Sequence, residues 1–253
     1  MKKLLIMIFI FVYGFLFASE KIQNLIENGK YKEAEKAINK ITSTIERNEL
    51  LDELSIKLIE NSELKNATKI AKKITSTITR NSRYEDIANA YLEEGELKQS
   101  LKIAKKITST VTRNSLYEGI ANAHLDDNDL DSSKEITDKI TSTVIKNNLY
   151  EKIAKKYIKK KDTDNGLLII DDITSTVTKN NLNAKIVKIL IKQKKYTKAE
   201  EVTEEITSTV TKNNLYEKIA KIYIKNKDYD KAKVIVNQIT STVTKNSLMD
   251  KLK

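Results

Sequence analysis

The chain has 253 residues, with 46 Lys and Arg against 35 Asp and Glu, which gives a formal net charge of +11. It contains no Cys, no Trp, no Pro and one His, so disulfides, thiolate zinc sites and sites with several histidines are excluded. Five Gly and no Pro supply few of the turns that an all-β fold needs.

Residues 1–18 have the layout of a secretory signal peptide. Lys2 and Lys3 precede an almost wholly apolar run, and Ala18 offers a small residue for cleavage before Ser19. The run is shorter than the roughly 20 residues that a helix needs to span a bilayer. We therefore predict cleavage after Ala18 and export to the periplasm or the extracellular space, with no stable membrane insertion afterwards. The alternative is an uncleaved segment that anchors the protein in the membrane.

A strict internal repeat occupies the rest of the chain. The tetrapeptide Ile-Thr-Ser-Thr recurs every 33 residues without insertion or deletion, which is the signature of a repeat architecture. The copies begin at Ile41, Ile74, Ile107, Ile140, Ile173, Ile206 and Ile239. They delimit six full units, with a truncated unit before them and a half unit after them.

Each unit is predicted to form two helices. In the copy from Ile206, the Thr-Ser-Thr hydroxyls can cap a first helix, on which apolar residues from Tyr216 to Tyr223 recur at helical spacing. A polar break follows, and residues from Ala232 to Ile239 line one face of a second helix. No unit buries its apolar stripe alone, so neighbouring units must stack.

These residues resemble the tetratricopeptide repeat, which has an aromatic, a small residue and a Tyr on its first helix and an Ala on its second. The slot where the helices approach stays small in every unit. Its residues are Ala34, Ala67, Ser100, Ser133, Gly166, Ala199 and Ala232. The resemblance implies an all-α, αα-hairpin superhelical solenoid over residues 19–253, with partial units capping both ends.

Three features depart from that family's pattern. The period is 33 rather than 34 residues, and the family's helix-ending proline is missing. The copy from Ile173 is the weakest, because Asn183 and Val187 replace the aromatic and the small residue. These departures leave the pitch of the superhelix undetermined, but they do not change the predicted αα-hairpin architecture.

The sequence offers little for catalysis. His124 stands where other copies carry Tyr, which favours a packing role over a catalytic one. There is no Gly-rich phosphate loop and no nucleophile elbow. We predict no enzymatic activity, no cofactor and no metal, although scattered carboxylates that stacking brings together leave a hydrolase as an alternative.

Two polar ladders accompany the repeat. The Thr-Ser-Thr ladder is interpreted as helix capping, with modification or ice binding as alternatives. A basic residue followed by Asn also recurs in every copy, from Arg47-Asn48 to Lys245-Asn246. One interpretation is that these pairs bind a polyanion or the backbone of a peptide. The other is a structural role, in which the Asn bonds the preceding turn and the basic residue stays solvated.

Charge changes sign along the first helices. In tetratricopeptide proteins the first helices line a concave groove, so the resemblance places these charges there. The early units would present carboxylates, namely Asp52, Glu53, Glu60, Glu85, Asp86, Glu93, Glu118 and Asp126. The later units would present lysines, predicted to bind a partner, namely Lys152, Lys155, Lys159, Lys185, Lys188, Lys192, Lys218, Lys221 and Lys225. An ordinary solvated face is the alternative.

Together these features predict a non-enzymatic protein-interaction scaffold of the cell envelope or the exterior. Its partner would be a protein or peptide, acidic in character, held in the groove. The alternative is a binder of an anionic polymer or a membrane surface through the basic C-terminal half. Nucleic acid is a poor candidate, because the recurring Tyr are needed in the core and few aromatics remain to stack on bases.

Overall fold

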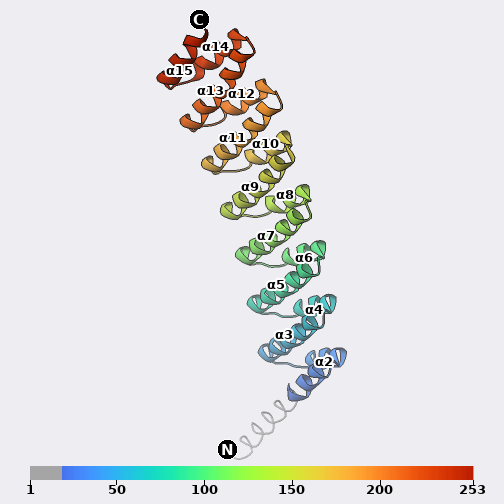
Figure 1. Cartoon of the computed structure of the whole chain (residues 1–253). Helices are drawn as coiled ribbons and strands as arrows, with labels where there is room; N and C mark the ends of the chain where they lie inside the picture. The colour runs from blue at the N-terminus through green and yellow to red at the C-terminus, as the bar shows by residue number, and fades with distance from the viewer. Residues whose placement is uncertain (1–18, 253) are drawn as a thin grey trace, which may run out of the picture. The chain divides into compact units, whose positions relative to one another are not determined.

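In the computed structural model, which describes residues 19–252, every regular element is a helix (Figure 1). A long helix and a short helix alternate with the period of 33 residues, which confirms the predicted αα-hairpin solenoid. The chain divides into two compact units, Met1–Ile120 and Ala121–Lys253, and the boundary falls within α7. The predicted signal peptide, residues 1–18, lies outside the described residues.

The N-terminal unit begins with a helical segment at 19–27, followed by hairpins of short and long helices. Its short helices are α2 (Tyr31–Ile38), α4 (Leu64–Ala71) and α6 (Leu97–Ala104). Its long helices are α3 (Thr44–Glu60), α5 (Thr77–Glu93) and the first part of α7 (Thr110–Asp126).

The C-terminal unit continues the same alternation. Its short helices are α8 (Leu130–Asp138), α10 (Thr163–Asp171), α12 (Tyr196–Glu204) and α14 (Tyr229–Gln238). Its long helices are α9 (Thr143–Lys160), α11 (Thr176–Lys192) and α13 (Thr209–Lys225), and the described chain ends with α15 (Thr242–Met249) and a 3₁₀ turn (Asp250–Leu252).

The small slot brings the two helices of a hairpin together, as predicted. Ser100 of α6 donates through Oγ to the carbonyl of Ala88 in α5 at 2.8 Å. Ser133 of α8 makes the same bond to Ala121 at 2.9 Å. A side chain that reaches the backbone of its neighbour leaves no room for a larger residue, so the slot fixes the packing distance.

Each turn from a long to a short helix contains one residue in the left-handed conformation. After α3 this residue is Ser62, with φ 57°. Its N–H bonds Ile59 O at 2.9 Å and the N–H of Glu63 bonds Leu58 O at 2.8 Å, which is the Schellman pattern that ends a helix. The same position recurs every 33 residues at Gly29, Gly95, Asn128, Lys161, Lys194 and Lys227. This turn ends each long helix without a proline.

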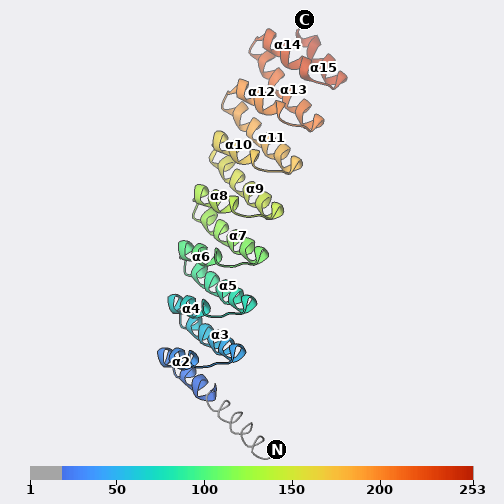
Figure 2. The same cartoon turned by 180° about the vertical axis from the view of Figure 1, so that it is seen from behind.

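The Thr-Ser-Thr turn caps the next long helix through its serine. Ser175 Oγ, for example, accepts a hydrogen bond from Thr178 N at 3.4 Å. Within each unit the first turns of the long helices follow one another along one edge, on the right in Figure 2. The capping interpretation is thereby confirmed, since the serine satisfies an N–H that the helix leaves unpaired.

The prediction that each Asn of the ladder bonds the preceding turn is wrong. Asn147 of α9 donates through Nδ2 to Thr174 Oγ1 at 2.8 Å and accepts from Thr174 N at 2.9 Å, so it bonds the turn of the following repeat. The basic neighbour, expected to be solvated, bonds the preceding turn instead: Arg80 Nη1 donates to Ile74 O at 2.8 Å. We call the first arrangement the Asn–Thr clamp. The other described clamps are Asn48–Thr75, Asn81–Thr108, Asn180–Thr207 and Asn213–Thr240.

The weak copy folds like the others. Asn183 and Val187 occupy buried positions of α11, at 7% and 0% exposure. Asn183 Oδ1 is buried without a hydrogen-bond partner, which is a local cost of replacing the aromatic. At the C-terminal end, Leu248 of α15 is buried at 2% exposure, consistent with its predicted capping role.

Candidate functional site

The nine predicted lysines lie on α9, α11 and α13, three on each helix. Within each helix they follow an i, i+3, i+7 spacing, which places them on one face. The 33-residue period aligns the three helices, so that Lys155, Lys188 and Lys221 are equivalent. All nine side chains are exposed. We call this set the lysine face.

Few of these charges are neutralised within the chain. Lys155 pairs with Glu151 and Lys221 with Glu217, both at 2.6 Å and one helical turn apart. Lys152 Nζ donates to Asn122 Oδ1 at 2.8 Å. The other six make no ion pair with any described residue, namely Lys159, Lys185, Lys188, Lys192, Lys218 and Lys225. The face therefore carries a strong net positive charge.

Two hollows lie between α9 and α11 on this face. The first, of about 470 Å³, is lined by Lys155, Lys185 and Lys188 together with Leu182 and Ala184. Glu151 of α9 and Thr211 at the start of α13 also line it. The structure thus brings lysines from successive repeats around one concave space.

The second hollow, of about 360 Å³, lies nearer the C-terminal ends of the same helices. Its apolar lining comes from Ile158 and Ile189, and Lys159 and Lys192 stand beside them. Both hollows combine apolar lining with cationic side chains. Such a surface can receive apolar groups and pair with carboxylates at the same time.

Three of the eight carboxylates predicted for the early units form ion pairs within the chain. Arg83 lies between two of its carboxylates, with Nε 3.0 Å from Asp52 and Nη1 2.9 Å from Asp86. Burial raises the pKa of Asp52, and the Arg83 charge opposes that rise only in part. Glu60 pairs with Lys57 at 2.8 Å. The other five predicted carboxylates make no ion pair with a described residue, namely Glu53, Glu85, Glu93, Glu118 and Asp126.

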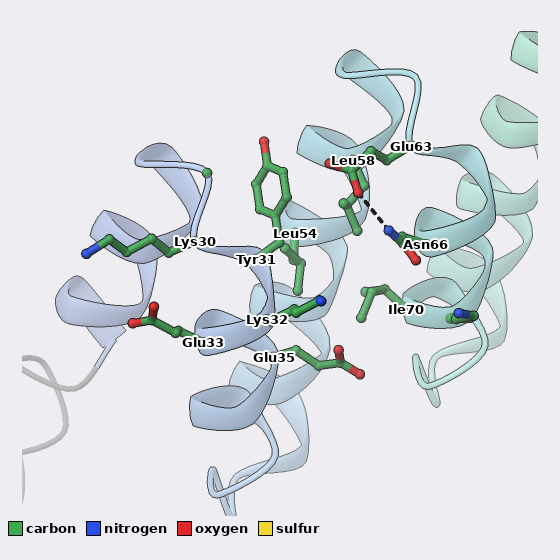
Figure 3. A pocket seen from close by; sticks show the side chains of 12 residues that line it. Lys30, Tyr31, Lys32, Glu33, Glu35, Leu54, Leu58, Glu63, Asn66 and Ile70 are labelled. Carbon is green, nitrogen blue, oxygen red and sulfur yellow. Dashed lines mark hydrogen bonds between the residues drawn. The ribbon is translucent and has the colours of Figure 1, made fainter.

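Sequence reasoning missed a third hollow, of about 490 Å³, in the N-terminal unit (Figure 3). It lies between α2 and α4, and Leu54 and Leu58 of α3 form its apolar floor. Its rim mixes both charges, and Glu35 there already pairs with Lys73 at 2.6 Å. A rim of mixed sign selects no class of ligand. The half-exposed Tyr31 after the Gly29 turn is the one sequence signal for this hollow.

The described residues supply no catalytic or metal-binding cluster. The side chain of His124 is 20% exposed, and its Nδ1 lies 3.3 Å from Asp129 Oδ2 in the turn of its own hairpin. This placement fits the predicted packing role. No group of three or more His, Cys, Asp or Glu within residues 19–252 is arranged to hold a metal ion. No helix in that range is long and apolar enough to cross a membrane.

No known family profile and no curated protein sequence match this chain. Solved structures of low similarity include the C-terminal part of a TPR repeat-containing protein from Cytophaga hutchinsonii, 16% identical, with a TM-score of 0.36 over 93% of this chain and 99% of that one. A tetratricopeptide repeat protein from Parabacteroides merdae is 16% identical, with a TM-score of 0.32 over 93% and 97%. The TPR2AB domain of yeast Sti1, in complex with pHSP90, is 15% identical, with a TM-score of 0.32 over 93% and 96%. TM-scores this low carry no inference about what this chain binds.

Proposed function

We propose that this chain is a non-enzymatic interaction scaffold whose lysine face binds an acidic segment of another protein. The observation that supports it is the set of six exposed lysines without an ion pair, four of which line two hollows with apolar lining. A face of one sign steers an oppositely charged partner and raises its association rate. The hollows then provide positions for its apolar side chains.

The hollows favour a peptide over a simple anionic polymer. The partly exposed Ala184, Ile158 and Ile189 offer apolar contact that a polyphosphate or a polysaccharide does not use. A peptide that alternates acidic and apolar residues can satisfy both the lysines and the hollows. The preferred ligand class is therefore an acidic peptide with apolar side chains.

The test uses three defined probes. A labelled peptide of alternating Glu and Leu is titrated with the protein by fluorescence anisotropy, beside a Gln–Leu peptide of equal length and a poly-aspartate. We expect the Glu–Leu peptide to bind most tightly, because it alone supplies both charge and apolar contact. Equal or tighter binding of poly-aspartate, with a steep loss on adding salt, would instead support the anionic-polymer function.

Matched variants locate the site. Lys188→Glu combined with Lys218→Glu changes two unpaired members of the lysine face, and we expect about tenfold weaker binding of the Glu–Leu peptide. Lys65→Glu combined with Lys98→Glu makes the same change of net charge on exposed positions of α4 and α6. Equal weakening by both pairs would mean that only net charge matters, and it would refute the assigned face.

Export through residues 1–18 is part of the same proposal and is supported by the leader sequence. Cell fractionation and mass spectrometry of the N-terminal peptide test it. An exported protein that begins at Ser19 is the expected result. A protein that retains Met1 in the membrane fraction would establish the anchored alternative, and recovery in the cytoplasm would refute export.

A further inference from the structure

The N-terminal unit exposes a row of large aliphatic side chains along one edge. The second residue of each of its long helices is Ile or Val, and the exposure of these side chains lies between 73% and 86%. They are Ile45 of α3, Ile78 of α5 and Val111 of α7. Side chains this exposed contribute little to the packing of the unit, so their position calls for a role at the surface.

The turns that lead into α5 and α7 are exclusively basic. Residues 69–82 and 102–115 run from the last turn of a short helix into the start of the next long helix, and each stretch contains four Lys or Arg and no Asp or Glu. Together with Ile78 and Val111 these cations form a surface that we call the basic edge. The cations are Lys69, Lys72, Lys73 and Arg80 in one repeat, and Lys102, Lys105, Lys106 and Arg113 in the next.

Hydrogen bonds hold the arginines of the basic edge beside its aliphatic side chains. Arg80 Nη1 donates to Ile74 O at 2.8 Å, and Nη2 donates to Thr77 Oγ1 at 3.3 Å, directly before Ile78 in the chain. Arg113 makes the equivalent bond to the backbone of the next repeat at 2.9 Å. Each guanidinium group therefore lies in the same turn as a pair of lysines.

The Asn–Thr clamps fix these turns against the preceding long helices. Asn48 of α3 accepts from Thr75 N at 2.9 Å, and Asn81 of α5 accepts from Thr108 N at 3.2 Å. Both threonines belong to the turns that carry the lysines. The basic edge is therefore part of the stacked framework, and a ligand meets cationic and aliphatic groups that are already in place.

Most cations of the basic edge are free to pair with a ligand. Lys73 lies 2.6 Å from Glu35 of α2. The other five lysines make no ion pair with any residue of the part of the chain that the structure describes. All six lysine side chains are exposed. The edge therefore presents a net positive charge to solvent.

The C-terminal unit keeps the aliphatic residue at this position but not the positive charge. Val177 and Val210 are exposed at 71% and 72%. The stretches around them, residues 168–181 and 201–214, each contain more carboxylates than cations. An anionic surface would attract the basic edge and repel these two stretches, so it would select the N-terminal unit.

We propose that the basic edge docks reversibly on an anionic lipid bilayer. Attachment of a protein surface to such a bilayer strengthens with the apolar area that enters the headgroup region and with the number of cations that face anionic lipids. Ile78 and Val111 enter the headgroup region, and the surrounding lysines pair with lipid phosphates. The long lysine stems can lie along the apolar groups while the charges remain in water.

The aliphatic side chains favour a bilayer over a soluble polyanion. A polyphosphate or a nucleic acid would pair with the cations and leave Ile78 and Val111 in water. Tyr84, Tyr91 and Tyr117 of this unit are buried and cannot stack on bases. A bilayer offers both negative charge and an apolar layer beneath it. No residue of the lysine face takes part, so this inference stands apart from the acidic peptide proposed above.

Vesicle co-sedimentation tests the charge requirement. It uses the chain from Ser19, which holds every described helix and lacks the apolar leader. We expect this protein to bind vesicles of phosphatidylcholine and phosphatidylglycerol, to release them as salt is added, and to bind pure phosphatidylcholine weakly. Lys72→Glu with Lys105→Glu should weaken binding about tenfold or more. Absence of binding to the anionic vesicles would overturn the proposal.

A matched pair of charge reversals separates the basic edge from the lysine face. Lys188→Glu with Lys218→Glu changes the net charge by the same amount, and we expect it to weaken vesicle binding far less. Equal or greater weakening by this pair would place any membrane contact on the lysine face and refute the basic edge. Unchanged circular dichroism of both double variants excludes misfolding.

A site-specific probe tests the entry of the aliphatic residues into the bilayer. The protein has no Cys, so Ile78→Cys and Val177→Cys can each be labelled with a polarity-sensitive fluorophore. We expect anionic vesicles to shift the emission to the blue at position 78 and to leave it unchanged at position 177. Ile78→Thr with Val111→Thr should also weaken vesicle binding, whereas Val177→Thr with Val210→Thr should not. Wild-type binding by the first pair would indicate attraction of charge alone and would overturn docking on a bilayer.

Discussion

The Asn–Thr clamp makes the sharpest prediction about how the repeats hold together. Asn147→Ala removes both bonds to Thr174, the Nδ2 donor to Oγ1 at 2.8 Å and the acceptor of Thr174 N at 2.9 Å. A hydrogen bond contributes about 0.5–1.5 kcal/mol net, so losing two exposed bonds should cost about 1–2 kcal/mol. Asn148→Ala is the matched control, because Asn148 is exposed on the same helix and gains the same helix propensity.

Three measurements test the contribution of the clamp. Urea unfolding monitored by circular dichroism compares the two variants, and the difference between them is the contribution of the clamp. Hydrogen exchange reports the Thr174 amide, which should lose protection only in Asn147→Ala. A double-mutant cycle with Thr174→Val should give a coupling energy, because both residues form one contact. Equal stability of the two Asn variants with an unchanged Thr174 amide would refute a structural role for the Asn ladder.

Two further predictions concern the core and the response to acid. Ala220→Leu should lower the free energy of unfolding by about 1–3 kcal/mol, because Ala220 is fully buried and a larger side chain overpacks the core. The control Ala184→Leu, at a partly exposed position, should change it by no more than about 0.5 kcal/mol. Equal thermal unfolding midpoints for the two variants would contradict the assigned helix register. The Tyr216 hydroxyl donates to Glu204 and, with Lys212, lowers the pKa of that carboxyl, so this stabilisation is lost as pH falls through the lowered pKa. Tyr216→Phe should therefore lose less stability than wild type between about pH 7 and pH 3, and parallel unfolding curves would contradict this.

Much of the fold could be predicted because one pattern is repeated. Apolar spacing, the small slot and the Thr-Ser-Thr caps each recur with the period, so every copy tests the interpretation of the others. The conformation of the turns and the partners of the Asn ladder could not be predicted as well. Lys161 and Ser62 do not by themselves indicate a left-handed turn, and only the equivalent Gly29 and Gly95 of other repeats point to it. The direction of the Asn bond depends on how neighbouring hairpins stack, which spacing alone does not determine.

The candidate site was predictable to a smaller extent. Helical spacing was enough to place the nine lysines on one face, because period and turn angle are fixed. It could not show that Arg83 would pair with Asp52, since that contact joins α5 to α3 of the preceding repeat. The hollows between α9 and α11 also depend on side-chain packing, so the sequence did not reveal them.

The internal repeats separate residues that hold the stack from residues that are free for other roles. The Ser cap, the small slot and the Asn–Thr clamp recur because each hairpin meets its neighbour through the same contacts. Positions that make no stacking contact can differ between repeats. The lysine face is an example, because it occurs on only three helices. The Ile or Val that follows the first Thr of each long helix, such as Val144, belongs to neither group, because it recurs but is exposed and does not contribute to the stack. Recurrence alone therefore does not show that a residue holds the repeats together.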